Sequence, residues 1–190
     1  MSASYSAASP RRRFLKLLGG GVPAGFLLKA SFAATAAKKT VRIIEFDAMG
    51  VRIGVVDVDK IEKPVAEWKK QLSKEQFEIT REAGTEFPGT GKYLNNHADG
   101  LYRCICCDTA LFDSKTKFES GTGWPSFWQP IAKENVAVRR DTSHGMIREE
   151  VLCTRCDAHL GHVFDDGPPP THLRYCMNSA ALNFVARRKS

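Results

Sequence analysis

The 190-residue sequence lacks long apolar runs. Its longest, residues 19–28, has about half of the roughly 20 residues that a membrane-spanning helix needs. Internal repeats are absent, and no low-complexity segment follows residue 37, which argues against repeat and disordered classes. The 15 glycines and 9 prolines are near average, so a collagen-like chain is excluded. These absences leave a globular protein with room for one domain.

Acidic residues are absent from residues 1–36, which hold five of the basic residues behind the net charge of +7. The rest of the chain is therefore near neutrality and offers no overall field that attracts nucleic acid. We expect no nucleic-acid partner.

Residues 1–36 have the three parts of an export signal: a basic stretch at 11–16, a short apolar run at 19–28 and small residues at 30–37. Arg11 and Arg12, followed by Phe-Leu-Lys at 14–16, resemble a twin-arginine signal, although Pro10 stands where Ser or Thr is usual. The alternatives are a basic disordered arm or an uncleaved anchor. We expect cleavage after Ala33 or Ala36, a periplasmic or otherwise exported protein, and contact with the membrane only during export.

The rest of the chain is predicted to be mainly β. Residues 41–58 alternate as a β-hairpin does, and residues 64–72 favour a short helix that begins at a proline. Ser73 and Gln76 have the spacing of a capping box for a second helix, which Gly84 is placed to end. From residue 89 the apolar segments are short and separated by turn residues. We divide the body into an N-terminal extension, 37–72, and a main domain, 73–190.

Four of the six cysteines form two C-x-x-C pairs, which favour a structural zinc site over disulfides. The ligands would be Cys104, Cys107, Cys153 and Cys156, because two intervening residues let one turn aim both sulfurs at a single ion. The alternatives are disulfides, redox-active C-x-x-C pairs, or a site that combines the second pair with His159 and His162. Cys106 is then a spare thiol.

Cys176 is the remaining cysteine. Arg174 precedes it, Asn178 follows two residues later, and His159 and His162 lie 17 and 14 residues earlier. Nearby cations favour the thiolate, the reactive form of cysteine, so Cys176 is a candidate nucleophile. The alternative is a buried structural cysteine.

Several segments together resemble the B-type methionine sulfoxide reductases, which are specific for the R epimer at sulfur. The resemblance covers roughly residues 70–185 and rests on G-T-G-W-P-S-F at 121–127, A-H-L-G-H-V-F at 158–164, D-G-P at 166–168, R-Y-C-M-N-S at 174–179 and both C-x-x-C pairs. It implies two antiparallel β-sheets with short N-terminal helices and a zinc site remote from the chemistry.

The resemblance also implies the reaction, reduction of methionine sulfoxide in oxidised proteins to methionine. Cys176 matches the nucleophile, which becomes a sulfenic acid. His159, His162 and Asn178 match the residues that orient and protonate the sulfoxide oxygen, and Trp124 matches the wall that receives the substrate methyl. The positions of Asp166 and Arg174 match supporting residues of the family, and His172 stands where the family often has glycine.

One departure from the family concerns Thr122, which stands where many members have a resolving cysteine. Either a thioredoxin-like protein attacks the sulfenic acid directly, or Cys106 forms a disulfide with Cys176. We favour the direct route, because Cys106 belongs to a metal-binding turn that is expected to be remote.

Two other functions compete with this interpretation: a zinc module that only binds partners, and a thiol–disulfide oxidoreductase that uses C-x-x-C directly. The second would need a βαβ context, whereas the surrounding sequence is typical of strands with turns. We expect a monomer whose partners are oxidised proteins and a thioredoxin-like reductant.

Overall fold

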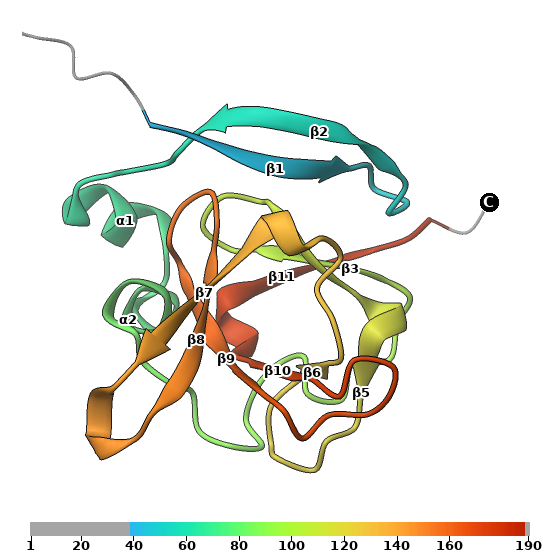
Figure 1. Ribbon diagram of the computed structural model, residues 1–190. Coiled ribbons are helices and arrows are strands. Elements are labelled where there is room, and N and C mark those ends of the chain that lie inside the picture. Colours follow the sequence, from blue (N-terminus) through green and yellow to red (C-terminus); the bar gives the residue numbers. More distant parts are fainter. Residues whose placement is uncertain (1–38, 189–190) are drawn as a thin grey trace, which may run out of the picture. The chain divides into compact units, whose positions relative to one another are not determined.

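The computed structural model describes residues 39–188, and the predicted export signal lies outside this range. The described residues form one compact unit (Figure 1). Between residues 39 and 188, no helix has the length and hydropathy that crossing a membrane requires.

Antiparallel sheets dominate the unit, which confirms the predicted mainly β class. A six-stranded sheet has the order β5-β6-β10-β9-β8-β7, and a three-stranded sheet has the order β11-β3-β4. The bounds in the larger sheet are β5 Lys117–Phe118, β6 Ser126–Phe127, β7 Val136–Asp141, β8 Arg148–Cys153, β9 His159–Phe164 and β10 Arg174–Met177. Those in the smaller sheet are β3 Gly100–Cys104, β4 Ala110–Asp113 and β11 Leu182–Ala186.

The core joins these two sheets through aromatic side chains. Tyr102 of β3, Phe112 of β4 and Phe127 of β6 are fully buried. The ring of Phe127 stacks on that of Phe112 with centroids 4.5 Å apart, and meets Tyr102 edge-on at 5.0 Å. Such pairs add to the hydrophobic free energy of burial, so this cluster fixes the sheet that carries Cys176 against its partner.

The predicted hairpin is present as β1 (Thr40–Phe46) and β2 (Arg52–Asp59), which form a separate two-stranded sheet. Its inner edge is held by the buried side chain of Asn135. The Asn135 amide accepts from Ile44 N–H at 2.8 Å and donates to Ile44 O at 2.9 Å and to Ala110 O at 2.7 Å. One side chain thus substitutes for a neighbouring strand and ties the hairpin to β4.

Both predicted helices are present, as α1 (Val65–Gln71) and α2 (Lys74–Glu82). Pro64 precedes α1, and Ser73 with Gln76 forms the predicted capping box of α2. The end of α2 differs from the expectation by one residue, because Ala83 takes the left-handed conformation (φ +53°). Gly84 follows it, and its N–H bonds to the carbonyl of Glu78 at 3.0 Å, which satisfies one of the last carbonyls of the helix.

Candidate active site and metal centre

The two C-x-x-C pairs lie at the ends of strands from different sheets, and the fold brings them together. Cys104 ends β3 and Cys153 ends β8, and each pair turns tightly after its strand. The four sulfurs of Cys104, Cys107, Cys153 and Cys156 lie within 4.8 Å of one another. The Sγ–Sγ distances are 3.6 Å for Cys104–Cys156 and 3.5 Å for Cys107–Cys153. The geometry therefore unites the four predicted ligands.

This cluster fits a tetrahedral metal ion better than it fits disulfides. Four metal–sulfur bonds of about 2.3 Å hold sulfurs about 3.8 Å apart, close to the distances found, whereas a disulfide requires about 2.05 Å. All six cysteines are free thiols. The pKa of the Cys107 thiol is lowered because Cys104, Cys153 and Cys156 donate hydrogen bonds to its sulfur. A cation bound by the four sulfurs would take the place of these shared protons.

Cys176 lies far along the chain from this cluster, on β10 between β6 and β9. Its cross-strand partners are Ser126 on one side and His162 on the other. Its sulfur is 3.8 Å from the hydroxyl of Thr122. A small cavity of about 120 Å³ opens over it, lined by Thr85, Trp124, Arg148, Gly161, His162, Phe164, Cys176 and Asn178. The structure thus places the candidate nucleophile in a cavity with three of the other predicted site residues.

A β-bulge in β9 brings His159 and His162 together. Residues three apart in a regular strand point to opposite faces. Here Val151 pairs with Gly161 and Leu152 pairs with His159, so Leu160 has no partner on β8 and forms the bulge. The extra residue places His159 and His162 on the same face of the sheet. The two rings meet edge-on with centroids 5.4 Å apart.

Each histidine bonds to a carboxylate from the neighbouring strands. His159 Nδ1 lies 2.8 Å from Glu150 Oε1, and His162 Nε2 lies 2.9 Å from Asp141 Oδ2. Arg148 reaches the same Asp141 oxygen at 2.7 Å. The possible metal-binding group found among the described residues consists of the four cysteines without either histidine, so the alternative site of two cysteines with two histidines is not formed.

His159 is buried, and its Nε2 has no hydrogen-bond partner among the described residues. Burial lowers the pKa of His159, and the Glu150 carboxylate opposes this effect only in part. His159 is therefore neutral at pH 7, with Glu150 fixing the ring orientation.

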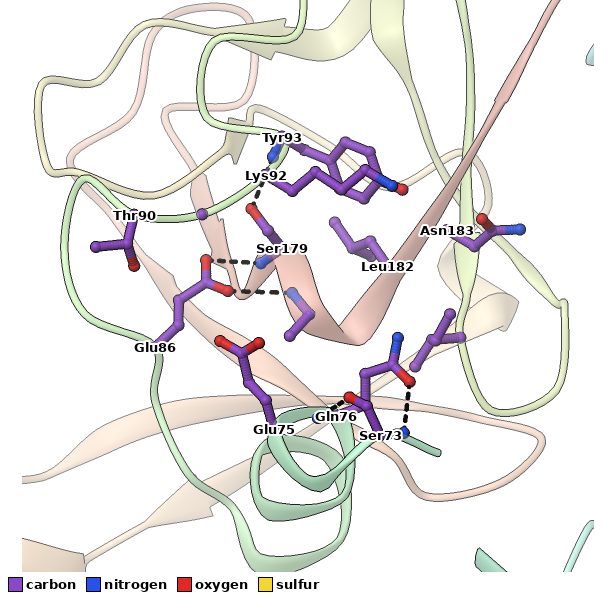
Figure 2. Close-up of a pocket in the computed structure, with 13 residues that line it drawn as sticks. Ser73, Glu75, Gln76, Glu86, Thr90, Lys92, Tyr93, Ser179, Leu182 and Asn183 are labelled. Carbon is purple, nitrogen blue, oxygen red and sulfur yellow. Dashed lines mark hydrogen bonds between the residues drawn. The ribbon is translucent and has the colours of Figure 1, made fainter. Parts of the chain in front are cut away.

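Trp124 and Asn178 are positioned by one residue, Glu86. Its carbonyl accepts from Trp124 Nε1 at 3.1 Å, and its N–H donates to Asn178 Oδ1 at 3.1 Å. The Glu86 carboxylate accepts from the N–H groups of Ser179 and Ala180, at 2.7 and 3.1 Å. Figure 2 shows the contact with Ser179. The two N–H groups open the short 3₁₀ turn, Ser179–Ala181, that directly follows the Cys176 strand. Glu86 thus links three parts of the site to one loop.

Arg174 supports the cavity from the other end of β10. It forms a paired hydrogen bond to the Asp166 carboxylate at 2.8 and 2.9 Å, and its guanidinium lies 4.3 Å from the centre of the Phe164 ring. Phe164 is part of the cavity wall. Arg174 also adds a positive charge near the Cys176 sulfur, which favours the thiolate.

Residues 72–186 match the SelR domain. The chain is 61% identical over 121 residues to the peptide methionine sulfoxide reductase MsrB of Thioalkalivibrio sulfidiphilus, a match that covers 64% of this chain and 88% of the relative. It is 58% identical over 130 residues to the MsrB of Pseudomonas fluorescens, with 68% of this chain and 100% of the relative covered.

The chain belongs to the SelR domain family of MsrB-type methionine sulfoxide reductases. This confirms the resemblance seen in the sequence. It also removes the thiol–disulfide oxidoreductase alternative, since antiparallel strands and not a βαβ unit surround both C-x-x-C pairs. His172, where the family often has glycine, takes φ +59°, in the left-handed region that glycine adopts most easily.

Sequence reasoning missed several residues of this SelR site. Glu86, Asp141 and Glu150 orient predicted site residues, and Arg148 lines the cavity. Acidic residues are common on strands and loops, so composition gave no signal for the three carboxylates. The strand register places Glu150 of β8 opposite His162 of β9, and His162 opposite Cys176 of β10. This alignment is visible only once the strands are paired.

Gly161 provides a first prediction, since a Cβ at this position would lie 2.1 Å from the carbonyl oxygen of Cys176, with φ at +154°. Gly161→Ala should lower the free energy of unfolding by about 3 kcal/mol, because neither backbone segment can move without breaking the β9–β10 pairing. Chemical denaturation measures this loss. Gly54→Ala is the control, with open space around its Cβ. Equal stability of the two variants would contradict the packing described.

The pH dependence of alkylation provides a second prediction. Burial raises the pKa of Cys176, while the Thr122 hydroxyl and Arg174 oppose the shift. Because only the thiolate reacts, iodoacetamide labelling of Cys176 should still rise with pH above the ordinary thiol pKa of about 8.5. Thr122→Val removes a hydroxyl that stabilises the thiolate and should move the curve to higher pH. A plateau below about pH 8, measured by peptide mass spectrometry, would contradict this assignment.

Proposed function

We propose that this chain reduces protein-bound methionine-R-sulfoxide to methionine with electrons from a thiol reductant. The observation that carries the proposal is the Cys176 thiol in a small cavity that it shares with Trp124, His162 and Asn178. Membership of the SelR family supports the same reaction.

In this mechanism the Cys176 thiolate attacks the sulfoxide sulfur. The sulfoxide oxygen becomes a good leaving group only when it gains a proton, so the step needs a donor in the cavity. His162 is the favoured donor, because it lines the cavity and the Asp141 carboxylate fixes the orientation of its ring at 2.9 Å. Oxygen passes to Cys176 as a sulfenic acid and methionine leaves, so the substrate gains two electrons and Cys176 loses them.

Trp124 and Asn178 orient the substrate in this proposal. The indole face suits a methyl group beside a polarised sulfur, and the Glu86 carbonyl holds the indole N–H. Asn178 is buried and bonded to Glu86 and Leu160, so it presents a rigid wall. Fixing the methyl on one side and the oxygen on another selects one epimer at sulfur.

The test of this function uses a peptide that carries the R or the S sulfoxide, with dithiothreitol as reductant and residues 37–190 as enzyme. Turnover of the R form alone is expected. Turnover of both epimers, or of neither by a folded and metal-loaded protein, would overturn the proposal.

For the return step we propose direct attack by a thioredoxin-like thiol on the Cys176 sulfenic acid. Thr122 stands 3.8 Å from the Cys176 sulfur, in the place of a resolving cysteine. Cys106 is buried and donates to the Thr80 hydroxyl at 3.4 Å, so it is directed toward α2. This direction favours the external route.

Thr122→Cys should convert the enzyme to an internal route. After one turnover without reductant, we expect the variant to hold a disulfide between the introduced thiol and Cys176. The unaltered protein should instead hold a sulfenic acid that can be trapped, and mass spectrometry distinguishes the two. A Cys106–Cys176 disulfide in the unaltered protein would reject the direct route.

We propose that the four-cysteine cluster holds one zinc ion, which acts as a structural cross-link between the turns that follow β3 and β8. Four thiolates in tetrahedral reach are the usual donor set for structural zinc.

The proposal also includes export by the twin-arginine route, which carries folded proteins, so that zinc is bound before the thiols meet an oxidising compartment. Fusion of residues 1–36 to a reporter should give export that Arg11→Lys with Arg12→Lys abolishes. Unchanged export in that double variant would reject the route.

A further inference from the structure

Two exposed apolar side chains flank the Cys176 cavity. Among the described residues, the most exposed large apolar side chains are Phe87, at 81%, and Ile147, at 71%. Phe87 comes two residues after Thr85, and Ile147 directly precedes Arg148; Thr85 and Arg148 both line the cavity. Single exposed apolar residues are ordinary. Two highly exposed apolar side chains beside one small cavity instead indicate a binding surface.

Hydrogen bonds hold the backbone on both sides of Phe87. The residue before it, Glu86, is bonded through its N–H to Asn178 and through its carbonyl to Trp124. Two residues after Phe87, Gly89 N–H bonds to Gly123 O at 2.8 Å. The backbone on both sides of Phe87 is therefore fixed by hydrogen bonds to residues of the site or of the Trp124 loop.

Ile147 opens onto a second cavity of about 490 Å³, with Val163 and Leu173 among its apolar walls. Arg148 and Phe164 line both this cavity and the one over Cys176, so the two cavities adjoin. An extended polypeptide advances about 3.3 Å per residue, so a side chain two or three residues from the oxidised methionine lies about 7–10 Å along the chain from it.

We propose that Phe87 and Ile147 form an apolar rim that binds apolar side chains two or three residues from the oxidised methionine. The occupant is an extended segment of an oxidised polypeptide, because the rim is continuous with the cavity that receives the sulfoxide. Burial of these two side chains against the substrate removes apolar surface from water and raises its affinity. This inference rests on the proposed function and names its preferred substrate: methionine-R-sulfoxide in an apolar sequence.

The test compares the unaltered protein with Phe87→Ser, Ile147→Ser and the double variant, all with dithiothreitol. The substrates are a peptide with leucine two and three residues on each side of methionine-R-sulfoxide, the same peptide with serine there, and N-acetyl-methionine-R-sulfoxide. Val65→Ser is the matched control, since Val65 is 60% exposed on α1 and lines neither cavity.

The unaltered protein should prefer the leucine peptide, and the double variant should lose about tenfold in kcat/KM for it while acting on the N-acetyl substrate as before. Equal losses on all three substrates, or no loss on the leucine peptide, would overturn the rim. The assays are repeated with a thioredoxin in place of dithiothreitol. A loss that appears only with the thioredoxin would also overturn the rim and would assign this surface to the reductant. No turnover of any sulfoxide by the unaltered protein would instead overturn the proposed function.

Discussion

Replacement of Cys176 with serine should abolish turnover of methionine-R-sulfoxide, with a loss of at least about 10⁴-fold in kcat. A serine hydroxyl stays protonated in this cavity and cannot attack the sulfoxide sulfur or carry its oxygen away. The substitution keeps the shape of the site, because serine can still contact the Thr122 hydroxyl beside it. Steady-state assays with dithiothreitol, together with denaturation curves, separate lost chemistry from lost folding.

Cys106→Ser is the matched control for this change. Cys106 is buried and bonds to Thr80 through a contact that a serine hydroxyl can also make. It should keep nearly full activity. A Cys176→Ser variant that retains even a tenth of the activity, or a Cys106→Ser variant that loses it, would mean that the nucleophile has been misassigned.

Loss of one metal ligand should have the largest effect on stability. Cys153→Ser should lower the free energy of unfolding by at least about 5 kcal/mol, because binding energies of about 10–16 kcal/mol are typical of structural zinc and depend on all four thiolates. Since domains are stable by only about 5–15 kcal/mol, the variant should be largely unfolded at room temperature. Metal analysis measures the zinc content per chain, and circular dichroism measures the loss of folded structure.

The four assigned ligands can be distinguished from the spare thiol in the same experiment. Cys106 directly precedes Cys107 but is not one of the four clustered sulfurs. Cys106→Ser should retain one zinc ion per chain, whereas serine at Cys104, Cys107, Cys153 or Cys156 should not. A stable, metal-free Cys153→Ser protein would contradict the structural role of the cluster.

The features that sequence could predict are those with local rules. A capping box at Ser73 and Gln76, alternation along the hairpin, and C-x-x-C spacing each report geometry within a few residues. The family motifs added the identity of the nucleophile and its neighbours. These signals were enough for the fold class and for the set of residues that meet in the cavity.

The remaining features depend on pairing between distant segments. His159 and His162 share a face only because Leu160 bulges out of β9, and a spacing of three in a strand predicts the opposite. Glu150 meets His159 only through the register of β8 with β9. Such features belong to the assembled sheet, so local sequence patterns do not show them.

The attachment of the N-terminal extension also depends on contacts between distant segments, which local sequence patterns do not show. The hairpin itself was predictable, but its attachment through Asn135, 91 residues from Ile44, was not. The extension also contacts the two C-x-x-C turns, since Ile61 N–H donates to Arg155 O at 2.8 Å and Gln71 Nε2 donates to Cys106 O at 2.7 Å. The matched SelR region begins at residue 72, so both contacts are made by residues that precede it. The division into 37–72 and 73–190 stays a prediction.

In the proposed mechanism, Cys176 takes the oxygen from methionine-R-sulfoxide. The most direct measurement is mass spectrometry of the enzyme after a single turnover without reductant, with dimedone present to trap sulfenic acid. We expect one methionine formed per enzyme molecule and one dimedone adduct, located on Cys176. Methionine formed without modification of Cys176, or an adduct on any other cysteine, would contradict it.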